Sequence, residues 1–259
     1  MKSLNEDLKT GQFKQIYLLY GEEAYLKKLY KNRFVKAMVP EGDTMNYRYF
    51  EGKNTNPKEI IDLAETLPFF AERRLIVLEN TGFLKNATPE LAEYLKNMPE
   101  TTYMIFVESE LDKRGKLYKA IKEKGHIVEL KRQDEKTLMR WAAGILAREG
   151  RKITTRDMEL FLTKTGTDMG NIRMELEKLI TYTMGQDIVT REDIEEICTT
   201  RTENKIFDMV RAVTERNQRR ALDLYNDLLT LREPPMRILF LLSKQFRQMC
   251  LAKKMAGEG

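Results

Sequence analysis

Histidine and cysteine are scarce in this chain of 259 residues. It has one histidine, His126, and two cysteines, Cys198 and Cys250. A single histidine excludes a zinc site built from several histidines and leaves one candidate base for a serine or cysteine nucleophile. Two widely spaced cysteines form neither a disulfide framework nor a metal cluster, and this usage is typical of a protein of the reducing cytoplasm.

Long apolar runs are also missing. No stretch approaches the roughly 18 apolar residues that a membrane-spanning helix needs, and the first residues lack the apolar core of a signal peptide. We therefore expect a cytoplasmic protein with no membrane partner. With 42% apolar and 33% charged residues, the composition is that of a globular protein. At roughly 100–200 residues per domain, the length predicts two domains and part of a third.

The positive charge is confined to the end of the sequence. Lys and Arg number 45 against 40 Asp and Glu, a net charge of +5, and residues 201–259 hold 12 of the basic and 7 of the acidic residues. Residues 1–200 are therefore neutral. Such a basic segment is either a solvated face or a surface for an acidic partner, and the charge alone leaves both open.

The first half of the chain alternates short apolar runs with helical patterns. Strands are predicted at residues 16–20, 46–50, 75–78, 103–107 and 126–130. Helical stripes separate them, and two of the helices begin at Pro57 and Pro89, where proline is tolerated. Strands that alternate with helices predict a parallel sheet covered on both faces, which is an α/β domain.

The second half reads as helical throughout. Helices are predicted at residues 134–149, 155–165, 169–184, 191–198, 204–216, 218–231 and 234–256. Thr154 and Thr190 each precede an acidic residue by three positions, a pattern typical of a helix start. We divide the chain into an α/β domain at 1–133, a small helical domain at 134–203 and an incomplete helical domain at 204–259.

The turn after the first strand resembles a phosphate-binding loop that has lost its function. A working loop needs a second glycine followed by lysine and a hydroxyl residue, which together surround phosphate and hold magnesium. Here Gly21 is present and Lys27 is near the right place, but the second glycine and the hydroxyl are missing. Glu22 and Glu23 bring negative charge to this turn. We therefore expect a structural turn that binds no nucleotide.

Two other candidate sites are weak. His126 opens the fifth strand, and no Gly-x-Ser-x-Gly motif accompanies it. Glu108 and Glu110 follow the fourth strand and resemble a glycosidase acid pair, but nothing near them in the sequence builds a sugar site. We interpret both acids as solvated loop residues and expect no catalytic residue and no metal site.

One connection carries large apolar side chains where polar residues are usual. Leu67, Pro68, Phe69 and Phe70 lie between the second helix and the third strand, and charged residues 72–74 follow them. The rings either pack into the edge of the sheet core or form an apolar peg for a partner's pocket. The pattern leaves both possibilities open. The connection is expected at the amino ends of the strands, opposite the edge where a nucleotide would bind.

Four segments together resemble the delta-subunit family of bacterial DNA polymerase III, whose members open the sliding clamp within the clamp loader. They read IYLLYGEE at 16–23, LPFFAERRL at 67–75, NIRMELEKL at 171–179 and KQFRQM at 244–249. The resemblance covers nearly the whole chain. It implies an AAA+-like architecture, with a RecA-like domain at 1–133, a helical lid at 134–203 and the beginning of a collar at 204–259.

The resemblance also implies a function and its site. Delta-like subunits do not hydrolyse ATP, so no cofactor is expected, although they belong to the DNA polymerase III holoenzyme, a DNA-directed DNA polymerase. The family's clamp-binding pair of bulky residues corresponds to Phe69 and Phe70, with Leu67 and Pro68 flanking them. The implied partners are the sliding clamp, other loader subunits through the collar, and primer-template DNA within the assembled loader. The family's collar continues for several helices past residue 259, so this chain is expected to bind a clamp while assembling poorly into a loader.

Three functional hypotheses follow. The leading one is a protein that binds and opens a sliding clamp during DNA replication while partner subunits hydrolyse ATP. The second is a P-loop-like ATPase that uses Lys27 or Lys28, which magnesium-dependent ATP binding would support. The third is a DNA-binding module formed by residues 201–259, which steeply salt-dependent DNA affinity would support.

Overall fold

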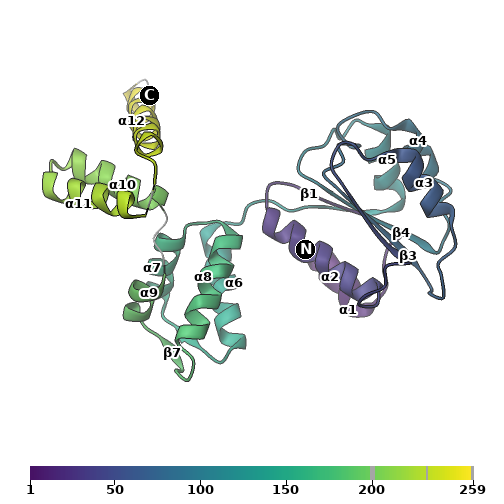
Figure 1. Ribbon diagram of the computed structural model, residues 1–259, viewed down its shortest axis with the longest axis horizontal. Coiled ribbons are helices and arrows are strands. Elements are labelled where there is room, and N and C mark those ends of the chain that lie inside the picture. The colour runs from purple at the N-terminus through teal and green to yellow at the C-terminus, as the bar shows by residue number, and fades with distance from the viewer. Residues whose placement is uncertain (199–201, 232, 258–259) are drawn as a thin grey trace. The chain divides into compact units, whose positions relative to one another are not determined.

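The computed structural model describes residues 1–198, 202–231 and 233–257 (Figure 1). The chain divides into two compact units, residues 1–133 and 134–259, and each is described by itself. The further division between a lid and a collar at residue 203 stays a prediction. Residues 199–201, next to that boundary, lie outside the described residues.

The first unit contains a parallel sheet of five strands. The strands are β1 (Ile16–Tyr20), β2 (Tyr47–Glu51), β3 (Arg74–Glu79), β4 (Thr102–Glu108) and β5 (His126–Glu129). Their order in the sheet is β2-β3-β4-β1-β5, and every neighbouring pair is parallel. The predicted parallel α/β class is therefore confirmed. Because all strands run in the same direction, the turn after β1 lies at the carboxyl ends of the strands, and the connection before β3 lies at their amino ends.

Helices cover both faces of this sheet. They are α1 (Lys2–Thr10), α2 (Ala24–Met38), α3 (Pro57–Glu65), α4 (Pro89–Tyr94) and α5 (Lys116–Lys124). Figure 1 shows α3, α4 and α5 on one side and α1 and α2 on the other. All five residues of β1 are buried, and alternate side chains serve opposite faces. Leu18 packs with α3 to α5, whereas the ring of Tyr17 lies 4.4 Å from that of Phe34 on α2.

Helix α1 was missed by the sequence analysis. Its only large apolar residues are Leu4 and Leu8, and of these only Leu4 is buried, so the apolar stripe is too short for periodicity to detect. It ends at Gly11, whose backbone is left-handed with φ of 72°, a common way to stop a helix.

The second unit consists almost entirely of helices. They are α6 (Glu135–Arg148), α7 (Thr155–Thr165), α8 (Met169–Tyr182), α9 (Arg191–Ile197), α10 (Thr202–Thr214), α11 (Gln218–Thr230) and α12 (Pro235–Gly257). Two two-residue strands, β6 (Lys152–Ile153) and β7 (Ile188–Val189), pair in parallel and were not predicted. None of the helices in the described ranges has an apolar stretch long enough to cross a bilayer.

The predicted helix starts are present. Thr190 and Asp193 form a complete capping box, in which each side chain bonds the other's backbone N–H. Thr154 accepts a hydrogen bond from the N–H of Asp157, and Asn56 caps α3 just before Pro57. These local signals needed no tertiary contact, which is why sequence alone could place them.

Candidate functional site

The turn after β1 is closed by the segment that follows β5. Gly21 has a φ of 122°, and a Cβ added there would lie 2.5 Å from the carbonyl oxygen of Leu130. That same carbonyl accepts the backbone N–H of Glu23 at 3.0 Å. In a phosphate-binding loop, such N–H groups point at the anion. Here one of them is already bonded within the protein.

A carboxylate caps α2 where a phosphate would sit. Glu23 is buried, and its side chain accepts the N–H of Tyr25 at the helix start. A negative group at this position satisfies a free helix donor and opposes a second anion. Glu22 is exposed and lies 3.6 Å from Arg132. The structure thus brings Gly21, Glu22 and Glu23 together in a turn whose contacts are internal.

Lys27 points from α2 toward the end of β4. Its Nζ donates to Ser109 Oγ at 2.8 Å and to the carbonyl oxygen of Glu108 at 3.4 Å. Burial lowers its pKa, although Glu79, Glu108 and Glu23 act in the opposite direction. The lysine therefore serves as a buried donor that joins α2 to β4.

We expect Lys27→Met to fold with nearly the stability of wild type. The variant removes a desolvated charge, which favours folding, and also removes the donor to Ser109 and Glu108, which opposes it. Because the two effects act in opposite directions, the free energy of unfolding should change by about 1 kcal/mol or less. Because the folded-state pKa is lowered, charged Lys27 opposes folding most strongly at low pH. This penalty fades as the pH rises toward the ordinary lysine pKa, so wild type and variant should converge there.

Thermal unfolding with and without Mg-ATP checks this prediction and the ATPase hypothesis together. A ligand that binds only the folded state raises the midpoint temperature. We expect no rise for either protein. A rise in wild type that Lys27→Met abolishes would contradict the structural role and favour the ATPase.

Glu108 and Glu110 do not form an acid pair. Glu108 is buried and accepts hydrogen bonds from the N–H and hydroxyl of Thr81 and from the N–H of Gly82. Burial raises its pKa, and these hydrogen bonds act against the rise. Glu110 is exposed and pairs with Lys85. The interpretation of both as solvated loop acids is therefore wrong for Glu108, which holds the connection after β3 in place.

His126 belongs to a network that attaches α1 to the sheet. Its Nε2 lies 3.1 Å from Ser3 Oγ, and its Nδ1 lies 3.3 Å from Asp7 Oδ2, which also accepts the hydroxyl of Tyr17 at 2.8 Å. Ser3 and Asp7 come from α1, Tyr17 from β1 and His126 from β5. The three side chains around the imidazole thus connect the N-terminal helix to two neighbouring strands. We assign this network a structural role.

We expect His126→Ala to lower the free energy of unfolding by about 1–2 kcal/mol. The change removes two side-chain contacts and leaves Asp7 with Tyr17 as its remaining donor in this network. Denaturant unfolding followed by circular dichroism measures the loss. Unchanged stability would contradict the structural assignment.

The apolar connection before β3 exposes its side chains. Leu67 is 77% exposed, Phe69 55% and Phe70 96%, while Pro68 is half-buried. The two phenyl rings contact each other edge to face, with centroids 4.6 Å apart. Phe70 has a φ of 47°, a left-handed backbone that bulky residues rarely adopt. The alternative in which both rings pack into the sheet edge is therefore excluded.

Two buried polar side chains hold this connection. The Asn46 amide accepts the N–H of Phe69 at 2.6 Å and donates to the carbonyl of Phe69 at 2.9 Å. Arg74 donates to the carbonyls of Thr66 at 3.2 Å and Leu67 at 2.9 Å. With the backbone fixed in this way, the rings can point into solvent without disordering the loop.

Asp43 holds Asn46 in the position from which it bonds Phe69. Its carboxylate accepts the side-chain amide of Asn46 at 2.8 Å and the backbone N–H groups of Met45 and Asn46 at 2.9 Å each. These hydrogen bonds from Asn46 lower its pKa, so the carboxylate stays ionised. We name Asp43, Asn46 and Arg74 the polar frame of the connection.

The polar frame could not be predicted from the sequence pattern. Arg74 stood out in the sequence only as one of the charged residues 72–74, but it is buried and donates to the backbone of the connection. Of the other two charged residues, Glu72 is exposed, and Arg73 lies over the rings of Phe13 and Tyr103. The signal that could have revealed Arg74 is its position at the start of a strand, directly before the apolar run at residues 75–78.

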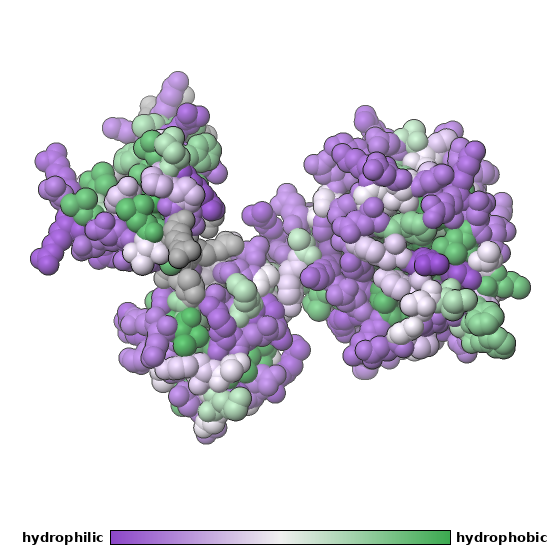
Figure 2. All heavy atoms as spheres, in the orientation of Figure 1, coloured by the Kyte–Doolittle hydropathy of each residue, from purple (hydrophilic) through white to green (hydrophobic). Residues whose placement is uncertain are grey.

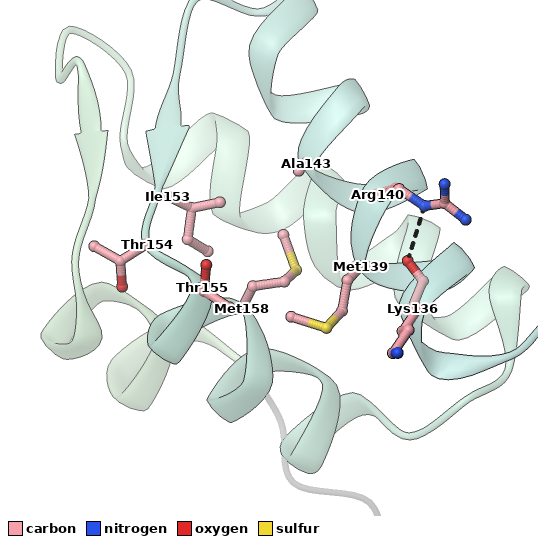
Figure 3. Close-up of a pocket in the computed structure, with 8 residues that line it drawn as sticks. All are labelled: Lys136, Met139, Arg140, Ala143, Ile153, Thr154, Thr155 and Met158. Carbon is pink, nitrogen blue, oxygen red and sulfur yellow. Dashed lines mark hydrogen bonds between the residues drawn. The ribbon is translucent and has the colours of Figure 1, made fainter.

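A groove lies in the helical part of the second unit (Figure 3). Its volume is about 560 Å³, and Met139, Ala143, Ile153 and Met158 line it together with Lys136, Arg140, Thr154 and Thr155. Figure 3 shows the side chains of Met139 and Met158 close together between α6 and α7. This groove was not predicted from the sequence, because Ile153 lines it from the unpredicted strand β6.

The end of the second unit also exposes apolar side chains. A small core of Ile206, Met209, Leu228 and Ile238 joins α10, α11 and α12. Met236, Leu239 and Phe240 on α12 are exposed. Of the basic residues counted in 201–259, Arg201 and Arg232 lie outside the described residues, and Lys205 and Arg237 pair with Asp227 and Glu233.

Comparisons with known proteins give one consistent result. The model of the family "DNA polymerase III, delta subunit" matches residues 17–131, and that of the "DNA polymerase III delta subunit, C-terminal domain" matches residues 203–259. The DNA polymerase III subunit delta of Bacillus subtilis is 28% identical over 98% of this chain and 77% of its own length. A probable DNA polymerase III subunit delta of Aquifex aeolicus is 23% identical over 95% of this chain and 72% of its own length.

A solved structure agrees with these sequence relatives. The Bacillus subtilis DNA clamp loader delta protein is similar with a TM-score of 0.74 and 27% identity, covering 100% of this chain and 80% of that one. The two family models cover separate regions in the same order as the sheet unit and the final helices. The chain therefore belongs to the family of DNA polymerase III delta subunits.

Proposed function

We propose that this protein binds the sliding clamp through Leu67, Pro68, Phe69 and Phe70 and opens it during DNA replication without hydrolysing ATP. The observation that carries the proposal is the exposure of the phenyl rings on a connection that the polar frame holds rigidly. Monomeric proteins rarely keep adjacent aromatic side chains in solvent without a partner for them. Family membership supports the sliding clamp as that partner, because a solved relative is a DNA clamp loader delta protein.

The binding energy available at this site is of the size that opening requires. Burying a phenylalanine side chain gives about 1.5–3 kcal/mol, so the pair gives about 3–6 kcal/mol. Changing a closed-to-open ratio from 99:1 to 1:99 takes roughly 5.5 kcal/mol of preferential binding to the open state. The rings favour opening only if their pocket is better formed in the open clamp than in the closed one.

Contacts at the turn after β1 support the proposal that this chain does not hydrolyse ATP. Glu23 caps α2, Leu130 bonds the backbone of the turn, and Lys27 is engaged by Ser109. A nucleotide would have to displace all three contacts. We therefore propose that other subunits of the loader bind and hydrolyse ATP.

The remaining partners follow from the second unit. We propose that α10 to α12 contact other loader subunits, since exposed Met236, Leu239 and Phe240 offer an apolar surface on α12. Primer-template DNA would be met within the assembled loader, in the cytoplasm.

A pull-down against the host's sliding clamp tests the proposal. Purified wild-type chain should retain the clamp in the absence of nucleotide, and Phe69→Ala plus Phe70→Ala should not. Equal retention by both proteins would show that the site assignment is wrong. No retention by wild type would remove the proposed function itself.

A further inference from the structure

Most of the large exposed apolar side chains of the first unit belong to two segments, the connection before β3 and the loop before β2. Its large apolar residues with exposed side chains are Met1, Met45, Tyr49, Leu67, Phe69 and Phe70. Figure 2 shows that hydrophilic residues cover most of the visible face of this unit. Three of the six exposed residues belong to the connection before β3. Met45 comes from a different segment, the loop that leads into β2.

Hydrogen bonds place Met45 beside that connection. One guanidinium nitrogen of Arg74 donates to the carbonyl of Met45 at 3.1 Å, while the other donates to the carbonyl of Leu67 at 2.9 Å. The next residue, Asn46, bonds both backbone groups of Phe69. The two segments are therefore fixed next to each other along their backbones.

Both backbone groups of Met45 form hydrogen bonds within the protein, so only its side chain is available to contact a partner. Its N–H donates to Asp43 at 2.9 Å and its carbonyl accepts from Arg74. The side chain is 59% exposed. Holding an apolar side chain in water has no benefit for folding, since burial is what stabilises such a group.

We propose that Met45 is a further anchor for the sliding clamp, on the same docking surface as Leu67, Phe69 and Phe70. This inference rests on the proposed function. The partner's surface next to its phenylalanine pocket would be apolar and would accept the flexible thioether of Met45. Methionine suits such a position because it is unbranched and polarizable, and it is enriched at protein interfaces.

The sliding clamp is the expected partner of Met45 because Met45 adjoins the connection that we propose to bind the clamp. The polar frame joins the backbones of Met45 and the connection through Asn46 and Arg74, so a partner that extends past Phe69 across this joined surface meets Met45 as well. Interfaces of stable complexes bury roughly 800 Å² per partner, more than two phenyl rings supply. Additional contacts next to the rings are therefore required, and Met45 is an exposed apolar side chain in the right place.

Titration calorimetry of the full chain with the host's sliding clamp tests the inference. Met45→Ala should weaken binding about tenfold and Met45→Lys more, because the lysine would carry a charge into an apolar contact. Met184, which is 76% exposed in the second unit, provides the matched control. Met184→Ala and Met184→Lys should leave affinity within twofold.

The outcomes separate this inference from the proposed function. Wild-type affinity in both Met45 variants, with binding lost in Phe69→Ala plus Phe70→Ala, would overturn the role of Met45 and leave the function standing. Wild-type affinity in the double phenylalanine variant would overturn both. Weaker binding in the Met45 variants and in the double variant, with both Met184 controls unaffected, would support the inference. If Met45→Lys fails to fold, Met45→Ala decides alone.

Discussion

Replacing Phe69 and Phe70 together with alanine is expected to weaken binding to the sliding clamp by about 100-fold or more. Each ring contributes about 1.5–3 kcal/mol when buried, and every 1.4 kcal/mol is a tenfold change in the dissociation constant. The rings are exposed in the free protein, so the substitution leaves the folded core intact. Its effect should therefore appear in binding and not in stability.

The matched control is a second neighbouring pair of exposed apolar residues. Leu239→Ala plus Phe240→Ala removes similar apolar area from α12. Titration calorimetry with the clamp should give this control the wild-type affinity. Thermal unfolding should place both double variants close to wild type, because exposed positions usually change stability by no more than about 0.5 kcal/mol. Equal affinity of wild type and the Phe69–Phe70 variant would refute the docking surface.

Asn46→Ala is expected to affect both stability and binding. The substitution removes the donor and the acceptor that fix the backbone of Phe69, together with the bond to Asp43. Losing these contacts should lower the free energy of unfolding by about 1–3 kcal/mol. The loosened loop must then be ordered when it binds, so clamp affinity should fall about tenfold although no contact residue has changed.

Asn171→Ala separates the positioning role of Asn46 from a general loss of stability. Asn171 also lies in a partly buried position, and its amide donates to the carbonyl of Thr165 in the second unit. Its replacement should reduce stability by a comparable mechanism while affinity stays within twofold of wild type. If both asparagine variants lose the same affinity, or neither loses any, the polar frame does not position the rings.

The sheet could be predicted from the sequence because its strands are locally distinctive. Residues 16–20, 75–78 and 103–107 are continuous apolar runs, and buried parallel strands require such runs on both faces. Helix α1 and the pair β6–β7 escaped prediction for the opposite reason. One buried leucine, or two residues per strand, carries no period that a pattern can detect.

The site could be predicted only in part, because its decisive contacts join distant positions. The composition of residues 67–70 showed that the connection is unusual, but the direction of its rings depends on Asn46 and Arg74. Asn46 lies just before β2, and Arg74 is the first residue of β3. Their side chains bond the backbone of residues 66–69, and a local sequence pattern carries no information about such contacts. Glu108 was misjudged for the same reason, since its hydrogen-bond partners at 81 and 82 lie on another connection.

The most direct test of the proposed function measures whether this protein opens the sliding clamp. A sliding clamp carrying a donor and an acceptor dye on opposite sides of one subunit interface reports the separation of that interface by energy transfer. The wild-type chain, added without nucleotide, should lower the energy transfer, and Phe69→Ala plus Phe70→Ala should leave it unchanged. Unchanged transfer with a wild-type chain that is bound to the clamp would contradict the claim that this protein opens it.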